Sequence, residues 1–167
     1  MFLKEMYVTD CKNPYKIFCN KRFMKQRPKI GLGVILMDFE KKRVLLGKRK
    51  NAHGDGTWSF PGGHLEKFEQ FLECAEREVL EETNLKEEKN YKLIDSNPSA
   101  ITNDFFYKEK KHYVTLFIRA YYFRGKPKIS NDEFEKWKWY KWNKLPENLF
   151  LPLKNLIKQN YNPFKLR

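Results

Sequence analysis

Three carboxylates lie close together in the sequence, at Glu78, Glu81 and Glu82. We expect a helix from about Phe68 to Thr83, on which these carboxylates share one side and Glu78 lies one turn before Glu82. Like charges at this spacing destabilise an isolated helix by roughly 0.2–0.5 kcal/mol per pair. A divalent cation with oxygen ligands would remove this repulsion, so the pattern predicts a metal site. The alternative is the usual one for a glutamate-rich helix, a face that is simply solvated.

The same helix carries an apolar stripe on a second face. The stripe lies about 100° from the carboxylates and consists of Leu72, Ala75, Val79 and Thr83. We therefore expect one side of the helix to pack in the core while the neighbouring side holds the metal.

A glycine-rich turn precedes the helix at residues 58–63, where the sequence is Trp-Ser-Phe-Pro-Gly-Gly. Glycine lets the backbone approach a ligand closely and turn a carbonyl towards it. Turn and helix together resemble the signature of the Nudix hydrolase family: Gly, five residues, Glu, seven residues, then Arg-Glu-apolar-x-Glu-Glu-x-Gly-apolar. The matching residues fill eight of its nine defined positions and are Gly63, Glu69, Arg77, Glu78, Val79, Glu81, Glu82 and Leu85.

The sequence departs from this signature at two places. Asn84 stands where the family has glycine, and asparagine is the residue that best replaces glycine in a left-handed backbone conformation. Lys67-Phe68-Glu69 replaces the commoner Phe-Gly-Glu, which changes the loop before the helix but not the carboxylates.

The resemblance implies roles for the matched residues. In the family, the glutamates that match Glu78 and Glu82 bind the essential cation, usually Mg²⁺, and the one that matches Glu81 joins them or orients the attacking water. The Gly62 carbonyl is a plausible further oxygen ligand, and Mn²⁺ is the expected substitute ion.

Glu69 and Arg77 complete the residues that we expect to support catalysis. Glu69 is expected to fix the loop through Arg77 or through backbone N–H groups, and Arg77 to orient Glu78 or to pair with Glu69 or Glu73. Family members often add one carboxylate from a distant loop. The candidates, among which the sequence does not choose, are Asp132, Glu133 and Glu135.

Other segments resemble the MutT-like branch of the family, which acts on purine and oxidised nucleoside triphosphates. These segments are residues 60–66, 111–115, 139–146 and 149–153. By this analogy the residues that bind the nucleotide are Phe60, Gly63, His64, Phe150 and Leu151. An apolar slot with one imidazole suits a flat base that also needs hydrogen bonds. The alternatives are a locally satisfied turn residue for His64 and ordinary core packing for Phe150.

The predicted activity is Mg²⁺-dependent hydrolysis of a nucleoside triphosphate to the monophosphate and pyrophosphate. The expected substrates are dNTPs or oxidised purine dNTPs such as 8-oxo-dGTP, whose removal would clean the nucleotide pool. One alternative is another nucleoside diphosphate linked to a second group: a dinucleoside polyphosphate, a nucleotide sugar or an mRNA cap. The other is a nucleic-acid-binding protein on the same scaffold, which an intact carboxylate trio disfavours because anions repel phosphates unless a metal is present.

The formal net charge is +13, but lysine is spread over nearly every segment, so the charge is mostly a general bias. Lys48-Arg49-Lys50 is the exception, because it lies just before the glycine-rich turn. We expect Lys48 and Arg49 to face the phosphates of the substrate. No long basic tract or RNA-binding module accompanies them, which disfavours a nucleic-acid partner and leaves a small nucleotide as the expected one.

We expect an α/β fold, the α/β/α sandwich with a mixed β-sheet that the resemblance implies. Residues 30–167 are expected to form the Nudix domain, and residues 1–29 an N-terminal extension packed on or flanking it. Expected strands cover residues 30–37, 44–47, 91–101, 112–123 and 137–142, and a second helix covers 149–160.

A cytoplasmic protein is expected from the remaining features. No apolar run approaches the roughly 20 residues that span a bilayer. Residues 1–29 lack the apolar core of a secretory signal, and an organellar targeting role for them is less favoured than packing on the domain. Cys11, Cys19 and Cys74 are odd in number and lack CxxC spacing, which favours reduced thiols. A homodimer is plausible by family analogy alone.

Overall fold

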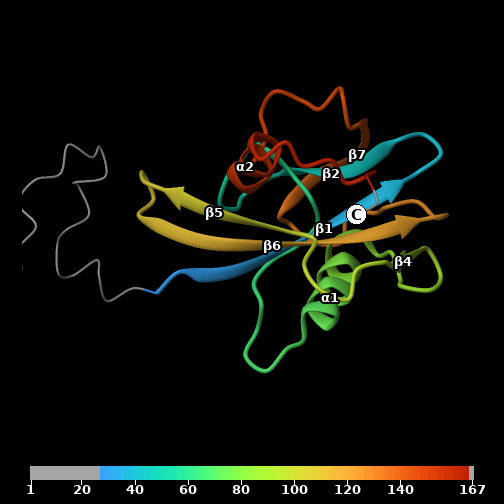
Figure 1. The fold of residues 1–167 in the computed structure, drawn as a ribbon, viewed down its shortest axis with the longest axis horizontal. Helices are drawn as coiled ribbons and strands as arrows, with labels where there is room; N and C mark the ends of the chain where they lie inside the picture. Colours follow the sequence, from blue (N-terminus) through green and yellow to red (C-terminus); the bar gives the residue numbers. More distant parts are fainter. Residues whose placement is uncertain (1–26, 166–167) are drawn as a thin grey trace, which may run out of the picture.

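The computed structural model describes residues 27–165, so most of the expected N-terminal extension lies outside the described residues. Between residues 27 and 165 three strands, a helix, four strands and a second helix follow one another along the chain (Figure 1). In order they are β1 (Lys29–Asp38), β2 (Arg43–Arg49), β3 (Trp58–Ser59), α1 (Phe71–Thr83), β4 (Tyr91–Leu93), β5 (Ala100–Phe106), β6 (Lys111–Tyr122), β7 (Phe134–Lys141) and α2 (Leu151–Lys158). None of the helices between residues 27 and 165 is long and apolar enough to cross a membrane.

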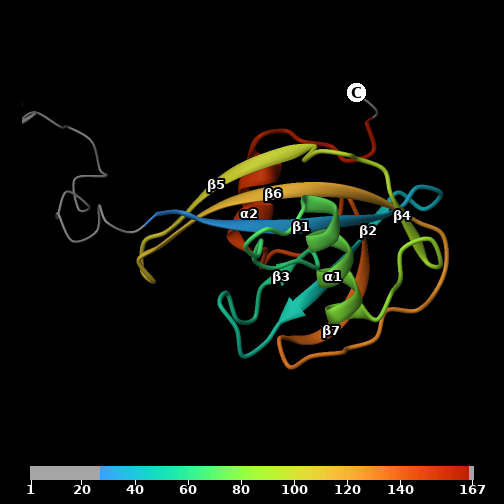
Figure 2. The ribbon, with the colours of Figure 1, turned by 90° about the horizontal axis from the view of Figure 1, so that it is seen from below.

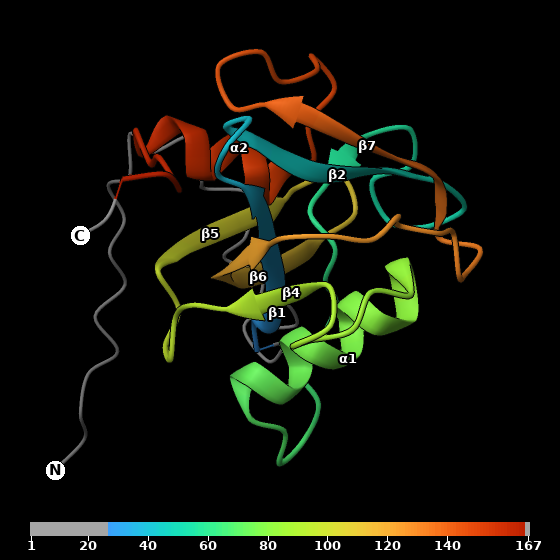
Figure 3. The same cartoon turned by 90° about the vertical axis from the view of Figure 1, so that its right-hand side faces the viewer.

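The strands form one mixed sheet. Its centre is the parallel pair β1–β6, with Lys29 opposite Tyr113 and Met37 opposite Tyr121. All other pairs are antiparallel: β2 pairs with β1, β3 and β7, while β6 pairs with β5 along its first half and with β4 near its end. Figure 3 shows β2 and β7 side by side and α1 on the far side of the central strands.

The two helices cover opposite faces of the sheet (Figures 1 and 2). Alternate residues of β1 divide between two apolar clusters, as a strand buried on both faces requires. Leu32 and Val34 pack with Ala75 and Val79 of α1, while Ile35 packs in the cluster that contains Leu153 of α2. The α/β/α sandwich with a mixed sheet is therefore confirmed.

The single strand expected over residues 91–101 is wrong. The chain forms two short strands, β4 and β5, joined by residues 94–99, where Pro98 has no backbone N–H to offer a sheet. In this connection the carboxylate of Asp95 accepts a hydrogen bond from the backbone N–H of Arg119 in β6, at 2.9 Å. β5 also continues beyond the expected end, to Phe106. A hydrophobicity pattern does not reveal this part of the strand, because its buried residues Thr102 and Asp104 are polar.

Helix α1 begins at Phe71, later than the expected start near Phe68. Phe68 has φ +68°, which no helix residue adopts, and its side chain is 90% exposed. Glu73 then fixes the helix start, because its carboxylate accepts the Gln70 N–H at 2.9 Å. The apolar stripe is confirmed for Ala75, Val79 and Thr83, all fully buried, and Leu72 is partly buried.

Helix α1 ends at Asn84, which has φ 56° and ψ 21° and donates its N–H to the Leu80 carbonyl at 2.9 Å. The expected left-handed conformation at this position is confirmed. We predict that Asn84→Val lowers the free energy of unfolding by about 1 kcal/mol, since a β-branched side chain opposes this conformation. Urea denaturation checks this, with Asn84→Gly as the matched control, and an equal loss in both variants would contradict the backbone explanation.

Candidate active site

A cavity of about 570 Å³ is lined by residues from β1, α1, the β5–β6 hairpin, the loop after β2 and the start of α2. Two kinds of group line it. The first is the carboxylates of α1 with the glycine turn, and the second is a set of aromatic side chains. The cavity therefore joins an anionic surface to an aromatic one, and each is described below.

The carboxylates of α1 differ in burial. Glu78 is 8% and Glu82 3% exposed, whereas Glu81 lies at the solvent side of the same cavity. The Gly62 N–H donates to Glu82 Oε2 at 2.9 Å. A Cβ at Gly63 would lie 2.3 Å from Glu78 Oε1, so only glycine leaves room for this carboxylate. The glycine turn and the carboxylates are thus fitted to each other.

Two buried carboxyl groups side by side are costly. Burial raises the pKa of Glu82 well above its usual range, although the Gly62 N–H favours the ionised form. Burial also raises the pKa of Glu78, against the hydrogen bond and positive charge of Arg77. Arg77 contacts only one of these two carboxylates, so the pair lacks a compensating charge within residues 27–165 that reaches both.

Arg77 ties the loop before α1 to the helix. It donates to both oxygens of Glu69, at 2.6 and 3.0 Å, to Glu78 Oε1 at 2.7 Å and to the His64 carbonyl at 3.1 Å. Glu69 also accepts the Glu66 N–H at 2.9 Å. These hydrogen bonds from Arg77 lower the pKa of Glu69 to about 2. Glu69 thereby contacts both Arg77 and the loop backbone, and Arg77 orients Glu78.

We predict that Glu69→Gln lowers the free energy of unfolding at pH 7 by about 2 kcal/mol, the scale of a hydrogen-bonded ion pair. The Glu69 pKa is lower in the folded state than its ordinary value of 4.5. Its contribution is therefore complete above about pH 4.5 and is lost as the pH falls towards 2. Urea denaturation of parent and variant between pH 7 and pH 3 should show the difference shrinking, and a pH-independent difference would contradict this origin.

The side chains of the neighbours Lys48 and Arg49 of β2 point in different directions, as those of successive strand residues do. Arg49 lines the cavity, where its guanidinium lies 4.8 Å from the centre of the Phe150 ring and its Nε donates to the His53 carbonyl at 2.7 Å. Lys48 is not among the cavity residues and pairs with Glu135 at 2.7 Å. The structure brings only Arg49 of this pair to the cavity.

The aromatic part of the cavity is centred on His53. Its ring lies edge-to-face on Phe106 at 4.3 Å and on Phe150 at 5.6 Å, and is roughly parallel to Tyr113 at 6.1 Å. His64 contacts the Tyr113 hydroxyl through Nε2 at 3.3 Å. Burial lowers the pKa of both histidines, so neutral imidazoles line the cavity at neutral pH. This part of the cavity is therefore aromatic, and Arg49 lies at its side.

The same cavity is lined by two residues with a buried polar atom that has no partner within residues 27–165, His53 (Nε2) and Ser59 (Oγ). Ser59 is 5% exposed, lines the cavity, and its Oγ has no hydrogen-bond partner within residues 27–165. Phe60 lines the cavity beside it and packs on Phe117 at 6.1 Å. Leu151 is not a cavity residue; the side chains that α2 contributes are those of Pro152 and Leu153.

The site can now be compared with known proteins. A family model described as NUDIX domain matches residues 27–160. The chain belongs to the Nudix family. The resemblance inferred from the turn and helix signature is confirmed, and the matched range begins within the expected N-terminal extension.

Curated Nudix relatives are distant. The chain is 33% identical over 95 residues to an oxidized purine nucleoside triphosphate hydrolase from Danio rerio, covering 57% of each chain. It is 34% identical over 62 residues to the protein of that name from Mus musculus, covering 37% of this chain and 40% of the relative. The matched segments thus cover 57% of the first relative's length and 40% of the second's. A MutT NUDIX hydrolase from Burkholderia pseudomallei has a similar structure, with TM-score 0.68, 25% identity and coverage of 80% of this chain and 98% of that one.

The donor set of the Nudix helix fits a hard divalent cation. Within residues 27–165 no group of three His, Cys, Asp or Glu side chains is arranged to hold a metal ion, and Glu81 is exposed and lies 3.5 Å from Arg77. Yet Glu78 and Glu82 are buried with raised pKa, and a bound cation would offset that cost. The Pro61 and Gly63 carbonyls accept bonds from β1, whereas the Gly62 carbonyl between them accepts none from residues 27–165. Oxygen ligands from two carboxylates and one carbonyl suit Mg²⁺.

The three distant carboxylates are separated by the structure. Glu133 lines the cavity, and its backbone carbonyl accepts the Lys50 N–H at 2.8 Å. Glu135 pairs with Lys48 and Lys136, and Asp132 is not a cavity residue. A register shift between β2 and β7 at Lys48 and Arg49 accompanies this arrangement. Glu133 is therefore the one of the three that the fold brings to the Nudix site.

Several cavity residues were missed by the sequence reasoning, namely Ser59, His53, Phe106 and Tyr113. Tyr113 lies inside a segment that carries the MutT-like resemblance, and Ser59 lies in the glycine-rich turn at residues 58–63, but neither side chain was singled out. Phe106 follows a strand that was expected to end at residue 101. His53 lies in a loop, and nothing in its local sequence indicates that it packs on rings from β5 and β6.

Proposed function

We propose that this chain is a Mg²⁺-dependent nucleoside triphosphate pyrophosphohydrolase that acts on dNTPs or oxidised purine dNTPs such as 8-oxo-dGTP. Mn²⁺ would substitute for Mg²⁺. The names of the curated relatives support this substrate class, and the cavity suits it. Its role would be to remove damaged nucleotides before they enter DNA, in the cytoplasm, where the buried free thiol of Cys74 would stay reduced. A homodimer, proposed from the family alone, can be tested by light scattering.

The observation that carries the proposal is that one cavity contains both parts a nucleotide needs. The buried carboxylates Glu78 and Glu82 lie where a cation would meet phosphates. The guanidinium of Arg49 contacts the ring of Phe150 and interacts electrostatically with Glu82, so Arg49 lies between the carboxylates and the aromatic slot. Aromatic rings with a few polar groups form the usual site for a flat base.

The proposed mechanism assigns the metal to Glu78, Glu82 and the Gly62 carbonyl. When bound, the ion would neutralise phosphate oxygens and lower the pKa of a coordinated water. Arg77 keeps Glu78 oriented, and Arg49 holds the substrate near the α-phosphate. Glu81, exposed on the cavity, orients the attacking water and takes its proton. Water attacks one of the two phosphorus atoms joined by the α–β bridging oxygen, and the bond from that phosphorus to the bridging oxygen breaks. The phosphate group on the other side leaves with the electron pair, which gives the monophosphate and pyrophosphate.

A screen of nucleotides with Mg²⁺ tests the proposal, because it separates pyrophosphate from orthophosphate among the products. We expect pyrophosphate and a nucleoside monophosphate from dNTPs or 8-oxo-dGTP. Cleavage of only dinucleoside polyphosphates, nucleotide sugars or capped RNA would replace this substrate class with the alternative. RNA binding without metal-dependent turnover would replace the enzyme with a binding protein.

Ser59 provides a test of the base slot. Because its buried Oγ has no protein partner, we predict that it bonds the base. Ser59→Ala should raise KM for the preferred nucleotide about three- to tenfold, the scale of one neutral hydrogen bond, with a smaller change in kcat. Steady-state kinetics on the four dNTPs and 8-oxo-dGTP measures this. An equal rise for every base would show that Ser59 does not read the base.

A further inference from the structure

The face of the sheet that α1 covers extends beyond the helix. Leu32 and Val34 of β1 and Ile118 and Ala120 of β6 pack beneath α1. Towards the start of both strands the same face continues, and here Ile30 is 44% exposed. Figure 2 shows α1 over the middle of the sheet and the β5–β6 hairpin extending past it.

Strand β5 extends this uncovered face. Asp104 lies on the face of the sheet opposite α1, because its carboxylate accepts hydrogen bonds from Thr115 of β6 and Asn155 of α2. Ile101 and Phe105 therefore lie on the α1 side by strand alternation, and they are 54% and 42% exposed. The register places Ile101 opposite Leu116 and Phe105 opposite His112. We call the apolar surface of Ile30, Ile101, Phe105 and Val114, with the buried Leu116 beneath it, the open sheet face.

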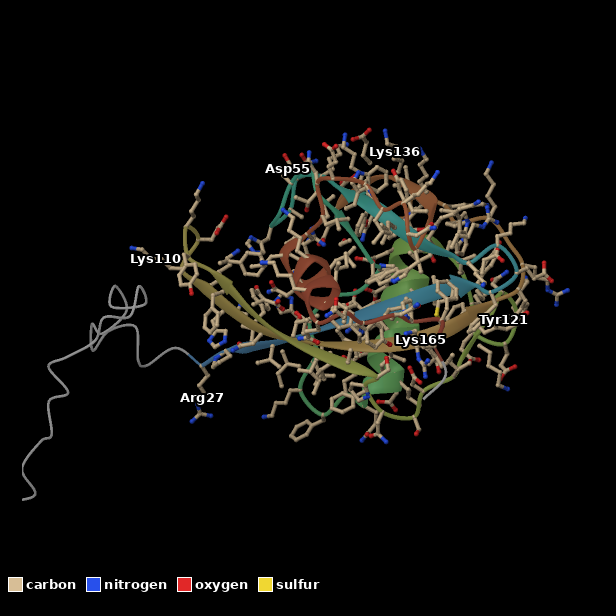
Figure 4. The ribbon with its side chains drawn as sticks, turned by 45° about the horizontal axis from the view of Figure 1, so that its top comes forward. Arg27, Asp55, Lys110, Tyr121, Lys136 and Lys165 are labelled. Carbon is tan, nitrogen blue, oxygen red and sulfur yellow. The ribbon has the colours of Figure 1, made fainter. Side chains whose placement is uncertain are left out.

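The described part of the chain begins close to this face, at Arg27. Figure 4 shows Arg27, where the description begins, at the same end of the molecule as Lys110 in the β5–β6 hairpin. The register agrees, since Lys29 lies opposite Tyr113. Pro28 has no N–H to offer a ladder bond, and β1 begins directly after it at Lys29. Residues 15–24 (YKIFCNKRFM) reach any point of the open sheet face within a few residues at ~3.3 Å each.

We propose that residues 15–24 dock on the open sheet face, with Tyr15, Ile17, Phe18, Phe23 and Met24 supplying the apolar contacts. The docked segment shields Ile30, Ile101 and Phe105 from water. The docked segment packs by its side chains and does not add a strand to the sheet. A backbone carbonyl at the outer edge of β5 already has a partner, because the side chain of Gln159, just after α2, donates to the Ile101 carbonyl at 3.0 Å.

The size of the face favours a tethered segment over a second copy of the chain. Three partly exposed apolar side chains present on the order of 300 Å², whereas a stable dimer buries about 800 Å² on each partner. A segment joined directly to β1 has a high effective concentration and needs no such area. Continuity with Arg27 therefore selects residues 15–24 as the occupant.

A single-stranded nucleic acid is the main competitor, because Lys108, Lys110 and Lys111 lie in the hairpin beside Phe105. The ring of Phe105, however, is already stacked on His112 at 4.4 Å and on Tyr107 at 5.9 Å. A base would have to displace these contacts, whereas an apolar segment packs against the exposed ring edges.

Disulfide trapping in the full chain tests the docking. Cys11→Ser leaves Cys19 as the cysteine within the segment, and Cys74 is buried. Ile101→Cys then places a thiol on the open sheet face. The matched control is Ile129→Cys, which has similar exposure (53% against 54%) but lies near the other end of α1, where Lys128 bonds the Thr83 carbonyl. Under mild oxidation the Ile101→Cys variant should form an intramolecular disulfide with Cys19 at least about tenfold faster than the control.

Three results would overturn the proposal. Equal rates for Ile101→Cys and Ile129→Cys would show that the segment does not prefer the face. Disulfides between two chains would assign the face to a second copy. If no cross-link forms, and a single-stranded oligonucleotide binds the parent protein but binds the Phe105→Asp variant more weakly, the open sheet face would be assigned to nucleic acid. Asn103→Cys, also on this face, repeats the test without removing an apolar side chain.

Discussion

Glu82→Gln should reduce turnover by about 10²- to 10³-fold, the equivalent of several kcal/mol of charge stabilisation supplied through the metal. Glu82 is 3% exposed and lines the cavity beside Glu78, so its charge would act directly on a bound cation. Glutamine keeps the size of the side chain and one oxygen that can accept the Gly62 N–H. The variant should therefore lose the cation but retain the fold.

The metal-free protein provides the test that separates these effects. Burial raises the pKa of Glu82, which shows that an ionised carboxylate is costly at this position. A neutral amide removes that cost, so the free energy of unfolding without metal should be unchanged or slightly higher. Mg²⁺ should raise the melting temperature of the parent and not that of Glu82→Gln, because only the parent binds the ion tightly.

Glu76→Gln is the matched control, since Glu76 is an exposed glutamate of α1 that does not line the cavity. Its turnover and its response to Mg²⁺ should equal those of the parent. Parent-like turnover in Glu82→Gln would remove Glu82 from the mechanism. A comparable loss in Glu76→Gln would attribute the effect to the general charge of the helix.

The carboxylate helix and its glycine turn could be predicted from sequence because their geometry is local. Helical periodicity alone places Glu78 beside Glu82 and sends Val79 into the core, and both expectations agree with the observed burial. The left-handed end at Asn84 follows from backbone sterics at one residue. Where a single element determines the position of a side chain, its sequence contains the information.

The aromatic half of the site could not be predicted in the same way. His53 meets Phe106 and Phe150 only because a loop, a hairpin and the start of α2 converge. The choice of Glu133 over its neighbours depends on how β7 pairs with β2. These placements follow from sheet register and tertiary packing, which local propensity does not determine. β5 was partly missed for a related reason, since its buried residues Thr102 and Asp104 are polar. Thr102 donates to Asp104 on the same strand, and Asp104 also accepts from Thr115 of β6 and Asn155 of α2.

Gly63→Ala should lower turnover about 10- to 100-fold, because it displaces Glu78, a proposed metal ligand, without removing it. The added Cβ would lie 2.3 Å from Glu78 Oε1 and 2.7 Å from Oε2, closer than real carbon atoms approach. Glu78 must therefore move, which also disturbs its 2.7 Å hydrogen bond from Arg77. A shift of about 1 Å in a catalytic group costs on the order of 10² in rate. Because a flexible carboxylate yields more easily than backbone, the fold should survive.

Gly31→Ala is the matched control for Gly63→Ala, since Gly31 lines the same cavity and a Cβ there meets Thr115 Oγ1 at an ordinary 3.5 Å. The control should keep turnover within about twofold of the parent, equivalent to about 0.4 kcal/mol, because the added methyl group makes only ordinary contacts and no neighbour has to move. Raising the Mg²⁺ concentration should partly restore Gly63→Ala but not Glu82→Gln, because only the former retains every carboxylate. If Gly63→Ala were as active as Gly31→Ala, Glu78 would have room to spare, and its close fit against the glycine turn would not position it for catalysis.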